Sequence, residues 1–212
     1  MQLTRKFQIQ SVEAISKFLN SQKVGRIASV DRNGFPQVIP MNFVYLDRFI
    51  YMHSHPVGEK LDNIQLNPKV GFEVDEHVCF LPSYYFHPTD ASQADTLYIS
   101  IVVKGRAELI QDRVEKSDAL NALMAKYQKE GNYEPLTREM HSVAEVTVIK
   151  VTPEQMYGKY KIGQHWPLPF RLKMAQKILS REGHAEGKRI LEIMGICIGK
   201  TGQLESVFEP VM

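Results

Sequence analysis

Apolar residues recur at every second position through much of the chain, which is the spacing that buries one face of a β-strand. Three such runs follow one another between residues 24 and 54, and the first connection holds Asn33-Gly34, a strong signal for a tight hairpin turn. Pro40 in this segment cannot donate a ladder hydrogen bond, so its strand is predicted at a sheet edge or a bulge. Longer strand patterns follow at 69–76, 96–110 and 144–162.

A spacing of three and four residues predicts helices elsewhere. Residues 11–22 place four apolar side chains on one stripe behind a Ser11 N-cap. Helical patterns also cover 58–68 and 113–127, and two more near the end of the chain meet at Gly183. Because five or six strands are joined by short turns with few intervening helices, the pattern favours a mainly β, antiparallel fold that is closed or sandwiched, with flanking helices.

Charge and cysteine content narrow the class of protein. Lys and Arg together number 26 and Asp and Glu 24, so the net charge of +2 gives no argument for nucleic acid or an anionic membrane as a partner. Cys79 and Cys197 form no CxxC pair and are predicted to be free buried thiols. Without a signal-type N-terminus or a run of about 18 apolar residues, we expect a soluble cytoplasmic protein.

Candidate chemistry gathers in the stretch MHSHPVGEKLDNI, which leaves a predicted strand and enters a predicted helix. His53 and His55 alternate along the strand and give, with Glu59, the spacing HxHx3E, the first half of the cupin metal motif. That motif also needs flanking glycines, where this chain has Asp47 and Leu66, and a later PxGxxH block that it lacks. These departures argue against a metal site.

The same stretch could instead bind a phosphate. A chain that passes through Gly58 into a helix offers free backbone N–H groups and the positive end of the helix dipole to an anion. Ser54 would add a hydroxyl, and Lys60 would add a positive charge in the first turn. A lysine there is slightly unfavourable with the dipole, which a nearby anion would explain. An ordinary surface lysine on a first turn is an equally good interpretation.

The surroundings of this stretch decide between the interpretations. In order, the chain holds VGRIASVDRNGFPQVIPMNFVYL, IYMHS, a lysine just inside a helix, NPKVGFEVD and VVKGRAELI. This series resembles the FMN-binding split-barrel proteins, the pyridoxamine 5'-phosphate oxidase-like superfamily, and within it the 5-nitroimidazole-resistance (Nim) proteins. The resemblance covers about residues 5–155. It implies a split β-barrel, FMN as the cofactor and a homodimer with FMN between the subunits.

The resemblance also implies which positions would bind FMN. One strand, with Ile39, Pro40, Met41 and Asn42, would lie along the flavin ring. His53 and Ser54, at the end of another strand, would contact the ribityl phosphate, and Lys60 at a helix start would bind the phosphate. Ser100 would reach the flavin across the dimer interface. The oxidase has arginines where this chain has Glu59 and Ile39, which argues against a vitamin B6 phosphate as the substrate.

A C-terminal segment carries a second resemblance. MYGKYKIGQHWPLPFRLKMAQKI is similar to a segment of FMN-binding negative transcriptional regulators, another split-barrel branch. We therefore expect a split-barrel domain, 1–155, and a helical extension, 156–212, that packs on the barrel with Gln164, His165 or Trp166 at the entrance of the FMN site. The first helix of the extension carries cations that could contact nucleic acid or form a solvated face: Arg171, Lys173, Lys177 and Arg181.

These features lead to two functional hypotheses. The first is an FMN-dependent oxidoreductase that reduces a small acceptor such as a nitro compound; its nearest titratable side chains are Tyr51, His53 and His55, and no catalytic residue is identified. The second is a non-enzymatic flavin- or haem-binding protein or a flavin-linked transcriptional regulator, in which any of the seven histidines could ligate haem. The expected partners are a second copy of the chain and a small electron donor or acceptor, with no membrane and, on charge, no nucleic acid.

Overall fold

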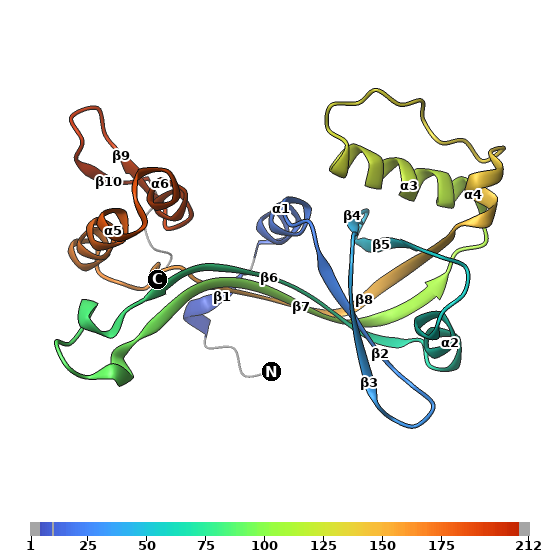
Figure 1. Cartoon of the computed structure of the whole chain (residues 1–212), viewed down its shortest axis with the longest axis horizontal. Helices are drawn as coiled ribbons and strands as arrows, with labels where there is room; N and C mark the ends of the chain where they lie inside the picture. The colour runs from blue at the N-terminus through green and yellow to red at the C-terminus, as the bar shows by residue number, and fades with distance from the viewer. Residues whose placement is uncertain (1–4, 10, 208–212) are drawn as a thin grey trace. The chain divides into compact units, whose positions relative to one another are not determined.

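The computed structural model describes residues 5–9 and 11–207 of the 212-residue chain. Its strands form an eight-stranded sheet in the order β3-β2-β6-β7-β8-β5-β4, with β1 paired to β8, and a separate hairpin of β9 and β10 (Figure 1). The strands are β1 (Gln8–Ile9), β2 (Gly25–Val30), β3 (Pro36–Met41), β4 (Val44–Leu46), β5 (Phe49–Ser54), β6 (Lys69–Leu81), β7 (Asp95–Leu109), β8 (Thr147–Lys161), β9 (Ile196–Ile198) and β10 (Leu204–Ser206).

Helices flank the strands, and of three short 3-10 turns one precedes β1 and two lie between β6 and β7. The helices are α1 (Val12–Ser21), α2 (Glu59–Leu66), α3 (Arg113–Tyr127), α4 (His141–Glu145), α5 (Leu168–Glu182) and α6 (His184–Ile193), and the 3-10 turns are η1 (Arg5–Phe7), η2 (Ser83–Tyr85) and η3 (Ala91–Gln93). The strand pairs β2–β3, β2–β6, β4–β5 and β5–β8 are antiparallel, and in the last of these Ile50 lies opposite Val151. The predicted mainly β, antiparallel class with flanking helices is confirmed.

Two compact units divide these elements. Of the described residues, the barrel unit comprises 9, 11–75 and 101–158, and the helical unit comprises 5–8, 76–100 and 159–207. This division shows which residues are compact together, and it does not show that either unit folds by itself. The expected domain boundary after residue 155 therefore stays a prediction. In the part of the chain that the structure describes, no helix is long and apolar enough to cross a membrane.

The predicted hairpin lies between β2 and β3. The Asp31 side chain accepts hydrogen bonds from the N–H groups of Asn33 and Phe35, both at 2.8 Å, and Gly34 takes a positive φ of 87°. Since β3 stands at the end of the sheet order, Pro40 lies on an edge strand, as predicted.

The short connection between β3 and β4 brings about the closure of the barrel unit. β3 and β4 are the two ends of the sheet order, yet only Asn42 and Phe43 separate them in the chain. Consecutive Cα atoms are about 3.8 Å apart, so the Cα atoms of Met41 and Val44 lie within about 11 Å of each other. The end of β3 and the start of β4 must therefore lie close together, although no ladder joins these two strands among the described residues.

This connection is buried and anchored by α3. Phe43 is fully buried, and its ring contacts the Phe72 ring edge-on with 5.1 Å between centroids. Its N–H donates to the Tyr127 hydroxyl at 2.9 Å, and its carbonyl accepts from Lys126 Nζ at 2.8 Å. Lys126 Nζ also lies 3.7 Å from the centre of the Phe43 ring. The backbone of the buried connection thereby finds the hydrogen-bond partners that burial requires.

β6 is longer than the sequence pattern predicts. The expected strand ended at residue 76, whereas β6 continues to Leu81. Val78 and Cys79 are adjacent and both buried, so the two-residue period breaks although the strand continues. Tyr84 and Tyr85, which follow this strand, lie in the 3-10 turn η2.

The helical unit contains α5 and α6, the two predicted C-terminal helices, which meet at Gly183 with a φ of 79°. They approach closely at Gly187, where a Cβ atom would come within 3.0 Å of the Leu179 backbone. Cys79 and Cys197 are both free thiols, as predicted, although Cys197 is only half-buried.

Tyr127→Phe removes the hydroxyl that accepts the Phe43 N–H and leaves this buried donor without its partner. We expect the free energy of unfolding to fall by about 1–3 kcal/mol, the usual cost of such a group. Urea denaturation measures this loss. Tyr133→Phe, in the loop after α3, is the control and should change stability by no more than about 0.5 kcal/mol. Equal losses in both variants would show that the hydroxyl does not anchor the connection.

The environment of Lys126 predicts a pH dependence of stability. Burial lowers its pKa in the folded protein from 10.5 to about 8. Between these values the unfolded chain binds more protons than the folded chain, so the contribution of Lys126 to stability rises as pH increases from about 8 to 10.5. Urea denaturation at stepped pH should show wild-type protein gaining unfolding free energy relative to Lys126→Met over this range. Parallel pH profiles would contradict the lowered pKa.

Candidate functional site

The start of α2 is an open helix terminus. β5 ends at Ser54, and the chain enters α2 through Gly58, whose φ of 152° and ψ of 151° are readily adopted only by glycine. No side chain of the described residues caps this end, and the Leu61 N–H donates to the Gly58 carbonyl at 2.9 Å. The N–H groups of Glu59 and Lys60 therefore have no partner within the helix. Such a terminus attracts anions.

The polar side chains at the end of β5 differ in availability. Ser54 is buried, and its hydroxyl donates to the His55 carbonyl at 2.9 Å, whereas His53 is exposed. The His55 ring accepts at Nδ1 from the Val57 N–H at 3.3 Å, so it is turned to its own loop. Among the described residues, no three His, Cys, Asp or Glu side chains are placed to hold a metal ion.

A buried hydrogen bond fixes α2 to the sheet within the barrel unit. The Asn63 amide on α2 donates to the Ser29 hydroxyl on β2 at 3.3 Å, and both side chains are buried. β2 in turn pairs with β3. The barrel unit therefore contains both the strand predicted beside the flavin ring and the residues predicted at the phosphate. They are Ile39, Pro40, Met41, Asn42, His53, Ser54 and Lys60.

Among the described residues no strand pairs with the outer edge of β3, which carries apolar side chains. Ile39 and Met41 are half-buried, Pro40 and Asn42 are exposed, and Val38 is 58% exposed. An apolar edge strand of this kind is normally covered, either by a ligand or by another chain.

Gln37, also on β3, is a candidate that the sequence analysis misses. Its side-chain oxygen is buried, yet no described residue donates a hydrogen bond to it. A buried acceptor without a donor costs roughly 1–3 kcal/mol, and a bound donor group would remove that cost. Strand alternation puts Gln37 on the same face as Ile39, which is the signal that could have found it.

Tyr51, one of the titratable side chains nearest to the stretch MHSHPVGEKLDNI, is engaged in a hydrogen bond to α3. It is buried in β5, and its hydroxyl donates to Glu115 Oε1 at 2.9 Å. The same carboxylate oxygen accepts from Lys150 Nζ at 2.7 Å. Burial, and then the hydrogen bond to Glu115, raise the pKa of Tyr51 well above its ordinary value. The side chain serves to fasten β5 to α3.

The other three predicted site residues lie in the helical unit. Ser100 is half-buried on β7. The Gln164 amide donates to the Tyr160 carbonyl at 2.7 Å, and Trp166 packs edge-on against Phe170 with 5.4 Å between centroids. Gln164 and Trp166 therefore have structural contacts of their own, and the role of all three residues in cofactor binding stays a prediction.

Comparison with known proteins supplies the family. Residues 11–160 match the family model described as pyridoxamine 5'-phosphate oxidase. The solved structure of a candidate 5-nitroimidazole antibiotic resistance protein from Bacteroides thetaiotaomicron is similar to this chain. The two share 28% identity and a TM-score of 0.61, over 72% of this chain and 85% of that one. No curated protein matches the chain.

Two further solved structures share the fold at lower identity. A flavocytochrome from Azotobacter vinelandii has 16% identity and a TM-score of 0.63, over 76% of this chain and 72% of that one. An FAD and haem binding protein from Mycobacterium smegmatis has 17% identity and a TM-score of 0.62, over 72% of each chain. The expected split-barrel fold with flanking helices is confirmed, while residues 161–212 lie outside the family match, so the regulator resemblance of the tail stays a prediction.

Proposed function

The chain belongs to the pyridoxamine 5'-phosphate oxidase family, and from this premise we propose that it is a flavoprotein that binds FMN and works as an oxidoreductase on a small acceptor. The observation that carries the proposal is the open start of α2. There, Lys60 occurs together with backbone N–H groups that have no partner within the helix, and the Asn63–Ser29 hydrogen bond fixes this helix to the sheet that contains β3. A terminal phosphate such as that of FMN suits this arrangement, because the N–H groups, the dipole and the ammonium all favour an anion.

Other described residues fit a flavin as well. The buried oxygen of Gln37 needs a donor, and flavin ring and ribityl groups carry N–H and O–H donors. The free edge of β3 offers unpaired backbone groups to a flat polar ring. When bound, FMN would supply one- and two-electron transfer. The residues of the chain would hold and orient it.

The residues that differ from the oxidase narrow the substrate class. Glu59 beside Lys60 and Ile39 on β3 put a negative and an apolar side chain where a phosphate-bearing substrate would need positive charge. We therefore favour a small acceptor without a phosphate. The similarity to the candidate 5-nitroimidazole resistance protein supports a nitro compound. Since Tyr51 is hydrogen-bonded to Glu115, the exposed titratable groups of the described residues at the end of β5 are His53 and His55.

We also propose that the functional form is a homodimer. Phe35 in the β2–β3 turn is 71% exposed and Val38 on β3 is 58% exposed, beside an unpaired strand edge. A second copy would cover this apolar edge. It would also bring its own residues to the flavin, as the resemblance implies for Ser100.

The cofactor prediction is tested on purified protein. Purified alone or soaked in FMN, the protein should show the visible spectrum of a flavin, and mass spectrometry of the heat-released cofactor should give FMN. Anaerobically reduced protein should then be reoxidised by a nitroimidazole in a stopped-flow experiment. Release of FAD would contradict the choice of FMN. A haem Soret band, or bound flavin that no acceptor reoxidises, would favour the non-enzymatic alternative.

Lys60→Ala should weaken FMN binding by about 1–3 kcal/mol, the usual loss for a charge-assisted hydrogen bond. Quenching of flavin fluorescence during titration with the flavin-free protein measures the dissociation constant. Lys17→Ala is the matched control, because Lys17 is an exposed lysine on α1 in the same unit, and it should leave FMN affinity unchanged. If both variants bind FMN equally, Lys60 is an ordinary surface residue and the phosphate does not lie at α2.

A further inference from the structure

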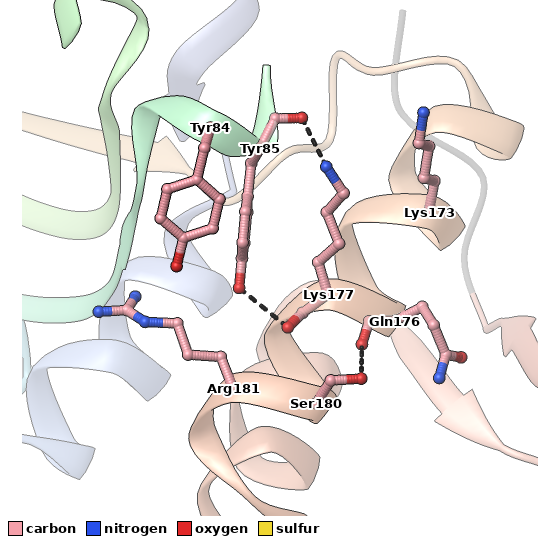
Figure 2. Close-up of a pocket in the computed structure, with 7 residues that line it drawn as sticks. All are labelled: Tyr84, Tyr85, Lys173, Gln176, Lys177, Ser180 and Arg181. Carbon is pink, nitrogen blue, oxygen red and sulfur yellow. Dashed lines mark hydrogen bonds between the residues drawn. The ribbon is translucent and has the colours of Figure 1, made fainter. Parts of the chain in front are cut away.

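A groove in the helical unit is left unexplained by the flavin proposal. It lies between α5 and the 3-10 turn η2, has a volume of about 580 Å³, and is lined chiefly by Tyr84, Tyr85, Lys173, Lys177, Ser180 and Arg181 (Figure 2). We call it the α5 groove. Its three cations are spaced by four residues, so they follow one face of the helix at about 6 Å per step. The volume is in the range of sites that hold a single small molecule.

The positive charge of the α5 groove is not neutralised by the residues that line it. Its lining contains three cations and, among the described residues, no carboxylate. Arg181 donates to the Phe80 carbonyl at 2.8 Å and pairs with Glu182 at 3.1 Å, and Lys177 Nζ donates to the Tyr85 carbonyl at 2.7 Å. These bonds hold two cations in place, and Lys177 keeps further N–H donors. Lys173 is exposed, and no ion pair joins it to a described residue.

The other wall of the α5 groove is aromatic. Tyr85 is buried and its hydroxyl donates to the Lys177 carbonyl at 2.9 Å, which fastens η2 to α5. Tyr84 packs edge-on against Tyr85 with 5.3 Å between centroids, yet it is 61% exposed. Figure 2 shows the two rings side by side, with the Tyr84 hydroxyl directed toward the Arg181 end of the groove. Tyr84 is therefore an exposed ring that lines the groove, and such a ring is a platform on which a planar group can stack.

We propose that the α5 groove binds a nucleoside di- or triphosphate, with the base stacked on Tyr84 and the phosphates bound by Lys173 and Lys177. A planar base and a short run of negative charges match the aromatic wall and the row of cations. A nucleic acid strand fits less well, because the cations span little more than two helical turns and the chain's net charge is only +2. The inference is independent of the flavin proposal, since the residues proposed for the FMN phosphate lie in the barrel unit.

Calorimetric titration of the full-length protein, saturated with FMN, tests this proposal with ADP as the probe. ADP should bind at least tenfold more tightly than either adenosine or pyrophosphate, because each lacks one half of the recognised group. Lys173→Glu should weaken ADP binding at least tenfold. Lys188→Glu, the same charge reversal at an exposed lysine of α6, should change it less than twofold.

Two more variants separate the parts of the site. Tyr84→Ala should weaken ADP binding at least fivefold and leave the affinity for pyrophosphate unchanged, since only the stacking surface is removed. Lys60→Ala should leave ADP binding unchanged, which distinguishes this site from the flavin phosphate site. Because Lys173 and Tyr84 are exposed, these variants should melt at the wild-type temperature.

Three results would overturn the proposal. The first is no ADP binding at millimolar concentration. The second is equal ADP affinity in Lys173→Glu and Lys188→Glu. The third is a single-stranded oligonucleotide that binds more tightly than ADP and loses its binding in Lys173→Glu, which would make nucleic acid the ligand of the groove.

Discussion

The two residues that connect β3 to β4 impose the constraint on which the barrel unit depends. Strands at opposite ends of the sheet order are tied together by Asn42 and Phe43, so the sheet cannot remain flat. Closure buries the connection, and a buried backbone must find hydrogen-bond partners. α3 provides them through Lys126 and Tyr127, whose positions at the end of that helix are therefore part of how the sheet closes.

The candidate flavin site uses backbone that this architecture leaves unbonded. The outer edge of β3 and the first turn of α2 both carry backbone polar groups that no described residue bonds. The Asn63–Ser29 hydrogen bond fixes α2 to β2, the strand beside β3. A site built largely from backbone tolerates change in the surrounding side chains. Under the proposed function, this explains why the chain can carry Glu59 and Ile39, where the resemblance implies arginines in the oxidase, and still keep Lys60 at the helix start.

Signals that are local in sequence predicted the fold well. The Asn33-Gly34 hairpin and the edge position of Pro40 each depend on neighbouring residues, and both are confirmed. What could not be predicted depends on distant partners. The contact of Lys126 with Phe43 joins residues 83 positions apart, and that of Tyr85 with Lys177 joins residues 92 apart. For the same reason the buried, donorless oxygen of Gln37 becomes visible only in the folded chain.

The pairing of β5 with β8 has a consequence for synthesis on the ribosome. Ile50 lies opposite Val151, so the ribosome adds about a hundred residues between the two partners. At roughly 5–20 residues per second, β5 waits about 5–20 s for β8. Throughout that interval the nascent meander displays a strand edge rich in apolar side chains, the kind of surface that recruits other chains. The time for which this edge is exposed is therefore set by the position of β8 in the sequence, and it ends once β8 has left the exit tunnel.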